Sequence, residues 1–246
     1  HEKGYLYANI YDFQTGKVTR SDIRASLEQN KNVMTVLCDS LPSGLFSFIS
    51  ISDSVFFCKE SSPDFTQQKR YLAGKTAGML PVIERLNEAK VSDSKDINII
   101  STIAKMSRVN ERIVEMPIGL NYINIYSLNG DFARTVCVGD ELDDISEIED
   151  RKEWNRMYTY ADLRLFKDFW GVVSINEDKM TFQTGRKKYP SILLFDWEGR
   201  PLAELKLTRF VNSFDIDMVN KTLYVFDVYN DKMFAYDLSE VLNKIV

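Results

Sequence analysis

Short apolar segments alternate with polar turn residues along most of the 246-residue chain. The segments are rich in Val, Ile, Tyr and Phe, which fit the pleated, half-buried surface of a strand. We expect an all-β fold with fourteen strands, at Tyr5–Asp12, Leu45–Ser52, Ser54–Lys59, Ile97–Ala104, Arg112–Met116, Asn121–Ser127, Phe132–Val138, Asp162–Phe166, Trp170–Ile175, Ser191–Asp196, Leu202–Leu207, Ser213–Met218, Thr222–Val228 and Lys232–Asp237.

Helical patterns are few and short, and they predict elements that decorate the strands. Met79–Ala89 repeats apolar residues at helical spacing and has Pro81 where a first helical turn would begin. Ser239–Ile245 predicts a terminal helix with a serine cap, and Asp22–Gln29 has a weaker helical pattern.

Turn residues stand between the predicted strands, for example at Asn129-Gly130, Glu198-Gly199, Asn230-Asp231 and Thr15-Gly16. An Asn-Gly pair favours positive φ at both central positions of a turn. Asn129-Gly130 therefore predicts a tight hairpin.

A strand–turn–strand unit recurs along the chain. Segments 123–136 and 192–205 match position by position when they are aligned on their glycines, and segment 8–18 is a looser copy. Phe195 and Tyr236 are 41 residues apart, whereas Tyr126 and Phe195 are 69 apart, which fits one period plus an insertion. We place that insertion in the polar stretch 139–156.

A period of about 40 residues with four strands per repeat is typical of a β-propeller. One four-stranded blade cannot bury both of its faces alone, so blades stack in a ring. The chain length corresponds to about six periods. We expect a single β-propeller domain over 1–246, six-bladed, with a five-bladed or incomplete ring as the alternative.

Several predicted strands end in an aromatic residue followed by Asp, at Asp12, Asp196, Asp227 and Asp237. A carboxylate at this position can accept hydrogen bonds from backbone N–H groups of the next turn. We therefore interpret these residues as structural rather than catalytic.

The units INIYSLNGDFARTV and SILLFDWEGRPLAEL, followed by FDIDMVNKTLYVFDVYNDKMFAYDL, resemble the TolB-like six-bladed β-propeller family. The similarity points to a branch of exported proteins and lipoproteins of Bacteroidetes with unknown function, and it is clearest over Ile97–Leu238. It implies an extracytoplasmic location, periplasmic or at the cell surface, with a lipid anchor carried by a removed N-terminus. The family offers no catalytic motif to transfer.

Composition narrows the possible chemistry. Lys and Arg total 31 against 36 Asp and Glu, a net charge of −5, so we expect no nucleic-acid partner. The single histidine is His1, so the interior has no imidazole for a Ser-His-Asp triad, a Cys-His dyad or a His-rich zinc site. No run of about 18 apolar residues occurs, so we expect no integral membrane span.

The three cysteines, Cys38, Cys58 and Cys137, form no CxxC motif. Cys58 and Cys137 lie in predicted strands, where we interpret them as small buried hydrophobic residues. A Cys38–Cys58 bridge stays open. The chain begins at His-Glu-Lys, which is typical of a trimmed or processed N-terminus.

Aromatic and basic residues gather in the segment 151–188. The binding candidates are Trp154, Tyr158, Tyr160, Trp170 and Arg164. Aromatic rings with Arg can bind sugars, anions or peptides, although packing between blades also needs such rings. The leading hypothesis is a binding or interaction module for a protein, peptide or glycan, not an enzyme, and without a cofactor.

The second hypothesis is a divalent-metal-dependent hydrolase or lactonase, with Ca²⁺ as its cofactor. Such chemistry uses channel carboxylates rather than histidine. The candidate ligands are Glu115, Asp162, Asp215 and Asp217, of which the last two stand two apart on a strand and share a face. The acidic stretch 139–150 lacks the spacing of an EF-hand and predicts a solvated short amphipathic helix or a loop instead.

Overall fold

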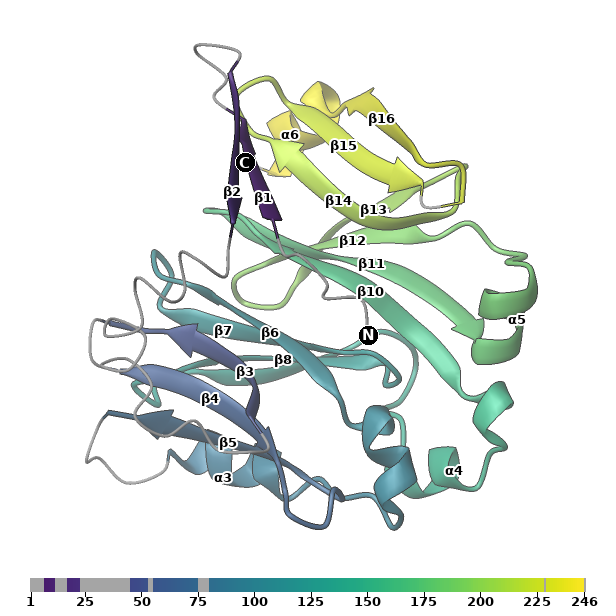
Figure 1. Ribbon diagram of the computed structural model, residues 1–246. Coiled ribbons are helices and arrows are strands. Elements are labelled where there is room, and N and C mark those ends of the chain that lie inside the picture. Colours follow the sequence, from purple (N-terminus) through teal and green to yellow (C-terminus); the bar gives the residue numbers. More distant parts are fainter. Residues whose placement is uncertain are drawn as a thin grey trace. The chain divides into compact units, whose positions relative to one another are not determined.

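The computed structural model describes residues 7–11, 17–22, 45–52, 55–74, 80–227 and 229–245. Its contacts divide the chain into two compact units, His1–Ser43 and Gly44–Val246. In the first unit, β1 (Tyr7–Tyr11) and β2 (Val18–Asp22) form an antiparallel hairpin (Figure 1). The predicted strand at the N-terminus is thus confirmed. Asp22 ends β2, so the weak helix that we expected to begin there does not begin at Asp22, and its remaining residues lie outside the described ones.

In the second unit, the described residues form four antiparallel sheets, and each sheet is an up-and-down meander of consecutive strands (Figure 1). Two of these sheets have three strands: β3 (Leu45–Ser50), β4 (Phe56–Ser61) and β5 (Gln68–Ala73) in one, and β14 (Val211–Asp217), β15 (Thr222–Asp227) and β16 (Lys232–Asp237) in the other. The other two sheets have four strands: β6 (Thr102–Ser107), β7 (Arg112–Pro117), β8 (Tyr122–Ser127) and β9 (Ala133–Cys137), then β10 (Met157–Leu165), β11 (Phe169–Asp178), β12 (Ser191–Asp196) and β13 (Pro201–Lys206).

The helices of the described part are short and lie between strands or at the end of the chain. They are α3 (Pro81–Asn87), α4 (Ile145–Glu149), α5 (Lys179–Thr184) and α6 (Ser239–Ile245), with 3₁₀ turns η1 (Ser94–Ile99) and η2 (Glu153–Asn155). The predicted helices at 79–89 and 239–245 are confirmed as α3 and α6. Asp144 caps α4 by accepting a hydrogen bond from Ser146 N at 2.8 Å, so the acidic stretch does contain the expected short helix.

Apolar side chains form layers between consecutive sheets. In chain order, the first to fourth sheets are β3–β5, β6–β9, β10–β13 and β14–β16. Phe57 packs with Ile113 and Tyr126 between the first and second sheets. Val114 and Ile125 pack with Trp170 between the second and third. A third layer joins the third and fourth sheets. The fold is mostly β, and its meander sheets stack face to face as the blades of a propeller do. The number of blades stays a prediction.

The strands that the sequence repeat aligns occupy equivalent positions in their sheets. Tyr126, Phe195 and Tyr236 lie on β8, β12 and β16, each the third strand of its sheet. The stretch 139–156, which we interpreted as the insertion, holds α4 and η2 between the second and third sheets. The repeat therefore located corresponding strands correctly.

The expected structural carboxylates are confirmed where they are described. Asp196 Oδ1 accepts hydrogen bonds from Glu198 N at 2.9 Å and Arg200 N at 2.8 Å. Asp227 Oδ1 accepts one from Tyr229 N, and Asp237 Oδ1 accepts one from Ser239 N. These carboxylates end strands and hold the next turn. Asp12 lies outside the described residues.

The turn at Asn129-Gly130 differs from the expected one. Gly130 has φ of +85°, whereas Asn129 is not among the residues with positive φ. Instead, Ser127 Oγ donates to Asp131 Oδ1 at 2.6 Å, and Asp131 N donates to Asn129 Oδ1 at 3.2 Å. Side-chain hydrogen bonds close a wider turn here, so a left-handed asparagine is not needed.

Several elements differ from the sequence prediction, among them β2, which was not predicted, and β10, which begins at Met157 rather than Asp162. The segment Ile97–Ala104 begins in η1 and becomes a strand only from Thr102. Strand β5 and helix α5 were not predicted, because both are rich in polar residues.

Cys58 and Cys137 are free thiols, buried and half-buried respectively, and Cys38 lies outside the described residues.

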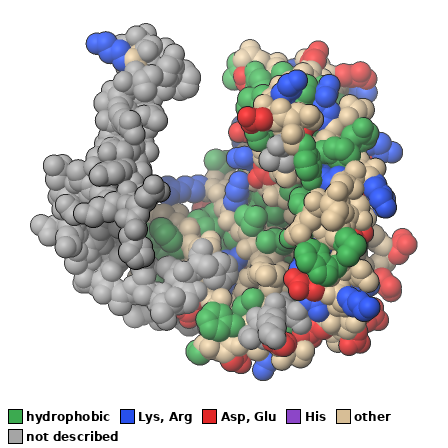
Figure 2. Space-filling model, turned by 45° about the vertical axis from the view of Figure 1, so that its right-hand side comes forward, with side chains coloured by type: hydrophobic (Ala, Val, Ile, Leu, Met, Phe, Trp, Pro, Cys, Tyr) green, Lys and Arg blue, Asp and Glu red, His purple; other side chains and the backbone are tan. Residues whose placement is uncertain are grey.

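Acidic and basic side chains are interspersed on the face seen in Figure 2. Within the described residues, no helix is both long and apolar enough to cross a membrane.

Candidate functional site

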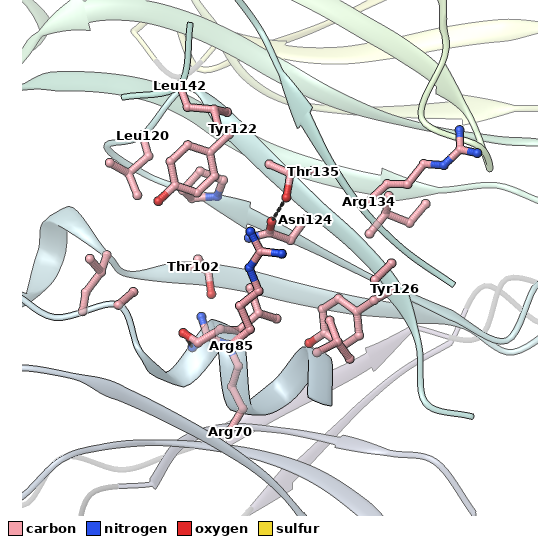
Figure 3. Close-up of a pocket in the computed structure, with 17 residues that line it drawn as sticks. Arg70, Arg85, Thr102, Leu120, Tyr122, Asn124, Tyr126, Arg134, Thr135 and Leu142 are labelled. Atoms are coloured by element: carbon pink, nitrogen blue, oxygen red, sulfur yellow. Dashed lines mark hydrogen bonds between the residues drawn. The ribbon is translucent and has the colours of Figure 1, made fainter. Parts of the chain in front are cut away.

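A cavity of about 360 Å³ lies beside α3 and the sheet β6–β9 (Figure 3). Its lining is mostly apolar and includes Val82, Leu86, Ile100, Leu120, Ile125 and Leu142. Polar side chains converge on it from five elements or their ends: Arg70, Arg85, Thr102, Tyr122, Asn124, Tyr126 and Thr135. A mainly apolar cavity of this size with a few convergent polar groups is typical of a ligand site.

Helix α3 provides one wall of the cavity. Pro81 stands at its first position, where a missing backbone N–H costs nothing. Val82 and Leu86 are four residues apart and therefore share the helix face that lines the cavity. Ile83 is buried in the core layer between the first two sheets, so the helix is held firmly. Arg85 extends from the same helix.

Asn87 ends α3 and continues the hydrogen bonding of β5. Its Oδ1 accepts a hydrogen bond from Arg70 N at 2.8 Å, and its Nδ2 donates to Arg70 O at 2.9 Å. The side-chain amide thus satisfies a donor and an acceptor on the open edge of the strand, as a neighbouring strand would. This contact fixes the position of α3 against the sheet.

The base of the cavity contains a buried ion pair between β5 and β7. Arg70 Nη2 lies 2.9 Å from Glu115 Oε2, and Arg70 Nε donates to both oxygens at 2.9 Å. Tyr126 Oη donates to Glu115 Oε1 at 2.7 Å, and Thr102 Oγ1 donates to Oε2 at 3.0 Å. Glu115 is completely buried. Its burial opposes ionisation, but Arg70 and Lys59 outweigh it and lower the pKa of Glu115 to about 2.

Lys59 adds a second buried cation to this base. Its Nζ donates to Thr102 O and Thr102 Oγ1, both at 2.6 Å. Burial lowers the pKa of Lys59 to about 8, although Glu115 raises it and Arg70 lowers it further. The side chain is therefore mainly charged at pH 7. This buried group, Lys59, Arg70 and Glu115, thus holds two cations and one carboxylate.

The polar groups nearer the opening are less engaged. Thr135 Oγ1 donates to Asn124 Oδ1 at 2.8 Å, as Figure 3 shows. Arg134 turns its guanidinium away from the cavity (Figure 3), and its Nη2 lies 3.3 Å from Glu198 Oε2. Arg85 is exposed, and none of the described residues forms an ion pair or side-chain hydrogen bond with its guanidinium. Arg85 is thus the cation that a ligand can reach.

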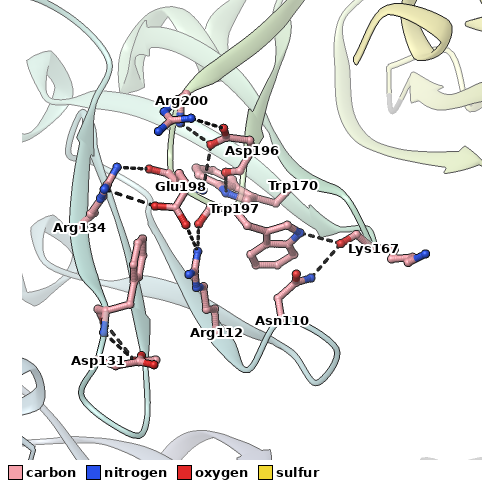
Figure 4. A network of polar contacts seen from close by, with 12 residues as sticks. Asn110, Arg112, Asp131, Arg134, Lys167, Trp170, Asp196, Trp197, Glu198 and Arg200 are labelled. Atoms are coloured by element: carbon pink, nitrogen blue, oxygen red, sulfur yellow. Dashed lines mark hydrogen bonds and ion pairs between the residues drawn. The ribbon is translucent and has the colours of Figure 1, made fainter. Parts of the chain in front are cut away.

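A polar network next to this cavity joins the second and third sheets (Figure 4). Arg112 Nη1 lies 3.0 Å from Glu198 Oε1 and also donates to Trp197 O. The Arg112 guanidinium lies over the ring of Phe132, 3.7 Å from its centroid. Trp197 Nε1 donates to Lys167 O at 2.9 Å. These contacts fix the end of the hairpin β8–β9, whose outer strand lines the cavity.

The five binding residues proposed from the sequence lie in different environments. Trp170 and Tyr160 are buried: Trp170 stacks on Phe195 at 4.5 Å, and Tyr160 Oη donates to Asn121 O at 3.0 Å. Tyr158 is half-buried, with its ring 4.9 Å from that of Phe182.

Trp154 on η2 is 48% exposed, and Arg164 pairs with Asp162 at 3.0 Å. The structure thus places two of the five in a core layer and does not gather them into one site. Their role in binding stays a prediction.

The four carboxylates of the metal hypothesis also lie in different environments. Glu115 belongs to the buried ion pair. Asp162 binds Arg164 and accepts a hydrogen bond from Phe214 N at 3.2 Å. Asp217 accepts hydrogen bonds from Val219 N and Asn220 N in its own turn.

Asp215 lines a second cavity of about 410 Å³ with Lys105 and Arg164. No group of three His, Cys, Asp or Glu side chains within the described residues could hold a metal ion. The four carboxylates do not form one set of ligands, so no reaction step is derived through a metal.

No sequence pattern pointed to a binding role for five polar residues of the cavity and its base: Arg70, Arg85, Lys59, Tyr122 and Asn124. One signal was present: Lys59 directly follows the apolar run Val55–Cys58, so a charged side chain enters a strand that is otherwise built for burial. Arg85 had no such signal, because an exposed arginine on a short helix is ordinary.

No protein-family model matches the chain, and a search of the curated proteins finds no significant match. Similar solved structures include a chain of the nidogen/laminin complex, with 11% identity over 79% of this chain and 61% of that chain and a TM-score of 0.42. Another is Kuenenia stuttgartiensis hydrazine synthase, with 12% identity over 97% of this chain and 60% of that chain and a TM-score of 0.45.

A third is Citrobacter koseri AztD, with 12% identity over 94% of this chain and 54% of that chain and a TM-score of 0.36. The chain spans about three fifths of the length of the first two chains. Similarities of this degree support no statement about ligand, activity or partner. The arrangement of the sheets shows a fold of the β-propeller type, and the cavity lies in a protein of this class.

Proposed function

We propose that this protein is a binding module of the β-propeller type, whose protein, peptide or glycan ligand places a group in the cavity beside α3. The observation that carries the proposal is the cavity itself: about 360 Å³, mostly apolar, with polar side chains from several elements converging on it. Its walls are held by the buried pair Arg70–Glu115 and by Asn87, so the cavity is formed before a ligand arrives. A preformed site avoids the cost of ordering on binding.

The proposal includes an extracytoplasmic location, in the periplasm or at the cell surface. Its support is the resemblance of segments 123–136 and 191–205 to TolB-like propellers of exported proteins. Fractionation of the native cells, with antibody detection of the chain, tests this location. Recovery with cytoplasmic markers would contradict it.

Binding in the cavity is tested by screening small amphipathic molecules of about 10 to 20 non-hydrogen atoms by NMR. We expect hits to shift the amide signals of Asn124, Thr135 and Leu142, which line the cavity. Ala133→Trp places a large ring from exposed Ala133 of β9 into the lining and should abolish these shifts.

The matched control is Lys206→Trp, an exposed position on β13 that lies outside the cavity. This variant should bind like the unmodified protein. Hits that bind Ala133→Trp as well as the unmodified protein would contradict the proposed site.

A further inference from the structure

We propose that the cavity takes a ligand with a carboxylate group on an apolar body, and that Arg85 binds this carboxylate. The inference rests on the proposed function, since it names the class of ligand for the same cavity. Three independent features support it: the hydrogen-bonding character of the open polar groups, the charge around the cavity and the apolar remainder of the lining.

The open polar groups of the lining can donate hydrogen bonds. The Arg85 guanidinium, the Tyr122 hydroxyl and Asn124 Nδ2 have no hydrogen-bond partner among the described residues. The acceptor Asn124 Oδ1 already receives the hydrogen bond from Thr135 Oγ1. An ionised carboxylate only accepts hydrogen bonds, so it complements these donors. A ligand group that must itself donate would find fewer partners.

Among the described residues, the charged side chains that line the cavity are arginines, whereas the pKa of Tyr122 is raised by burial and also by Asp143 and Asp144, which lie near it. At the base of the cavity, the buried group of Lys59, Arg70 and Glu115 holds two cations and one carboxylate. Thr102 connects this group to the lining, because its Oγ1 contacts both Lys59 Nζ, at 2.6 Å, and Glu115 Oε2, at 3.0 Å. Arg85 adds a further positive charge.

No Asp or Glu of the described part of the chain belongs to the lining. The carboxylate of Asp143, which follows Leu142 of the lining, is engaged by Asn121 N at 2.7 Å. Arginine side chains without an acidic residue beside them in the lining favour an anion over a cation there.

The form of the ligand follows from the rest of the lining. A planar guanidinium matches a carboxylate with two parallel hydrogen bonds. Leu86, Leu120 and Leu142 offer an apolar surface for the body that carries this carboxylate. The C-terminal residue of a peptide and a uronic acid of a glycan share this chemistry.

The test compares matched carboxylates and carboxamides by NMR titration at pH 7. The peptide arm uses N-acetyl-leucine and N-acetyl-leucinamide, and the glycan arm uses methyl glucuronide and its amide. We expect the carboxylate to bind at least about tenfold more tightly than its amide in one arm, which identifies the source. Arg85→Gln should remove this preference, and Arg85→Lys should keep part of it. The matched control Arg200→Gln should keep it, because that exposed arginine pairs with Asp196 and lies outside the cavity lining.

Equal affinity for carboxylate and amide in both arms would overturn the carboxylate assignment and leave the cavity as a site for neutral ligands. A preference that survives Arg85→Gln would overturn the role of Arg85. If no member of either pair shifts the signals of Asn124, Thr135 and Leu142, this inference fails. If the broader NMR screen also gives no hits there, the proposed function fails with it.

Discussion

Arg70 on β5 and Glu115 on β7 face each other in the interior, with Arg70 Nη2 2.9 Å from Glu115 Oε2, and they join two sheets at the base of the cavity. They stand 45 residues apart in the chain. Each would be a costly buried charge without the other. The relationship therefore links the stability of the fold to the shape of the proposed site.

Removing the carboxylate of Glu115 should destabilise the protein strongly. Glu115→Gln leaves Arg70 buried without its counter-charge, and we expect a loss of about 3 to 5 kcal/mol in the free energy of unfolding. Urea denaturation at pH 7 measures it.

The same variant should change the acid response. The pKa of folded Glu115 is about 2, below the ordinary value of 4.5, so its stabilisation is complete above pH 4.5 and disappears as the pH falls towards 2. Glu115→Gln should lack this part of the acid loss. An unchanged profile would contradict the pairing.

Lys59 predicts a second pH effect, which comes from a buried cation whose charged form is disfavoured by folding. Its pKa is about 8 in the folded protein, against 10.5 ordinarily, so the unfolded chain binds more protons between these values. Stability should therefore rise with pH from about 8 to 10.5 through this group. Lys59→Met should remove that rise in urea denaturation series. A rise of equal size in the variant would show that another group causes it.

Asn87 should matter more than an ordinary surface asparagine. Asn87→Ala removes two hydrogen bonds to the backbone of Arg70, and we expect a loss of about 1 to 3 kcal/mol. Exchange of the Arg70 amide hydrogen should also become faster, because its acceptor is gone. Asn98→Ala is the matched control at an exposed site and should change stability by less than about 0.5 kcal/mol. Equal effects of the two variants would contradict the strand-like role of Asn87.

The two arginines that meet Glu198 should differ in importance (Figure 4). The Arg112 side chain is 20% exposed, donates to Trp197 O and lies over the Phe132 ring, so Arg112→Ala should cost about 1 to 3 kcal/mol. The Arg134 side chain is 49% exposed, and Arg134→Ala should cost less than about 1 kcal/mol. Thermal denaturation of both variants measures the difference. A larger loss for Arg134→Ala would be the contrary result.

The sequence predicted the strands that are rich in apolar and aromatic residues, whether they are buried, as β12 is, or mostly exposed, as β16 is. Ser191–Asp196 and Lys232–Asp237 match β12 and β16 at both ends. Strand β5 was missed because its sequence, QKRYLA, is polar at the positions it buries, Gln68 and Arg70. Arg70 can be buried only because Glu115 lies opposite, and no local pattern contains that information.

The candidate site was less predictable than the fold. Aromatic residues between 151 and 188 were predicted as candidates for ligand binding. Trp170 and Tyr160, however, pack in the core layer between the second and third sheets. Glu115 was singled out as a metal ligand on residue type alone, whereas the structure surrounds it with Arg70, Tyr126 and Thr102. The cavity depends on residues from α3, β5 and β8 that come together only in the folded chain.

The most direct test of the binding proposal is a crystal structure of the protein at a saturating concentration of the carboxylate, N-acetyl-leucine or methyl glucuronide, that binds more tightly in the NMR titration. We expect electron density in the cavity beside α3, with a carboxylate oxygen about 3 Å from the Arg85 guanidinium and the body of the ligand against Leu120 and Leu142. Density for the ligand at another surface, with the cavity empty, would contradict it.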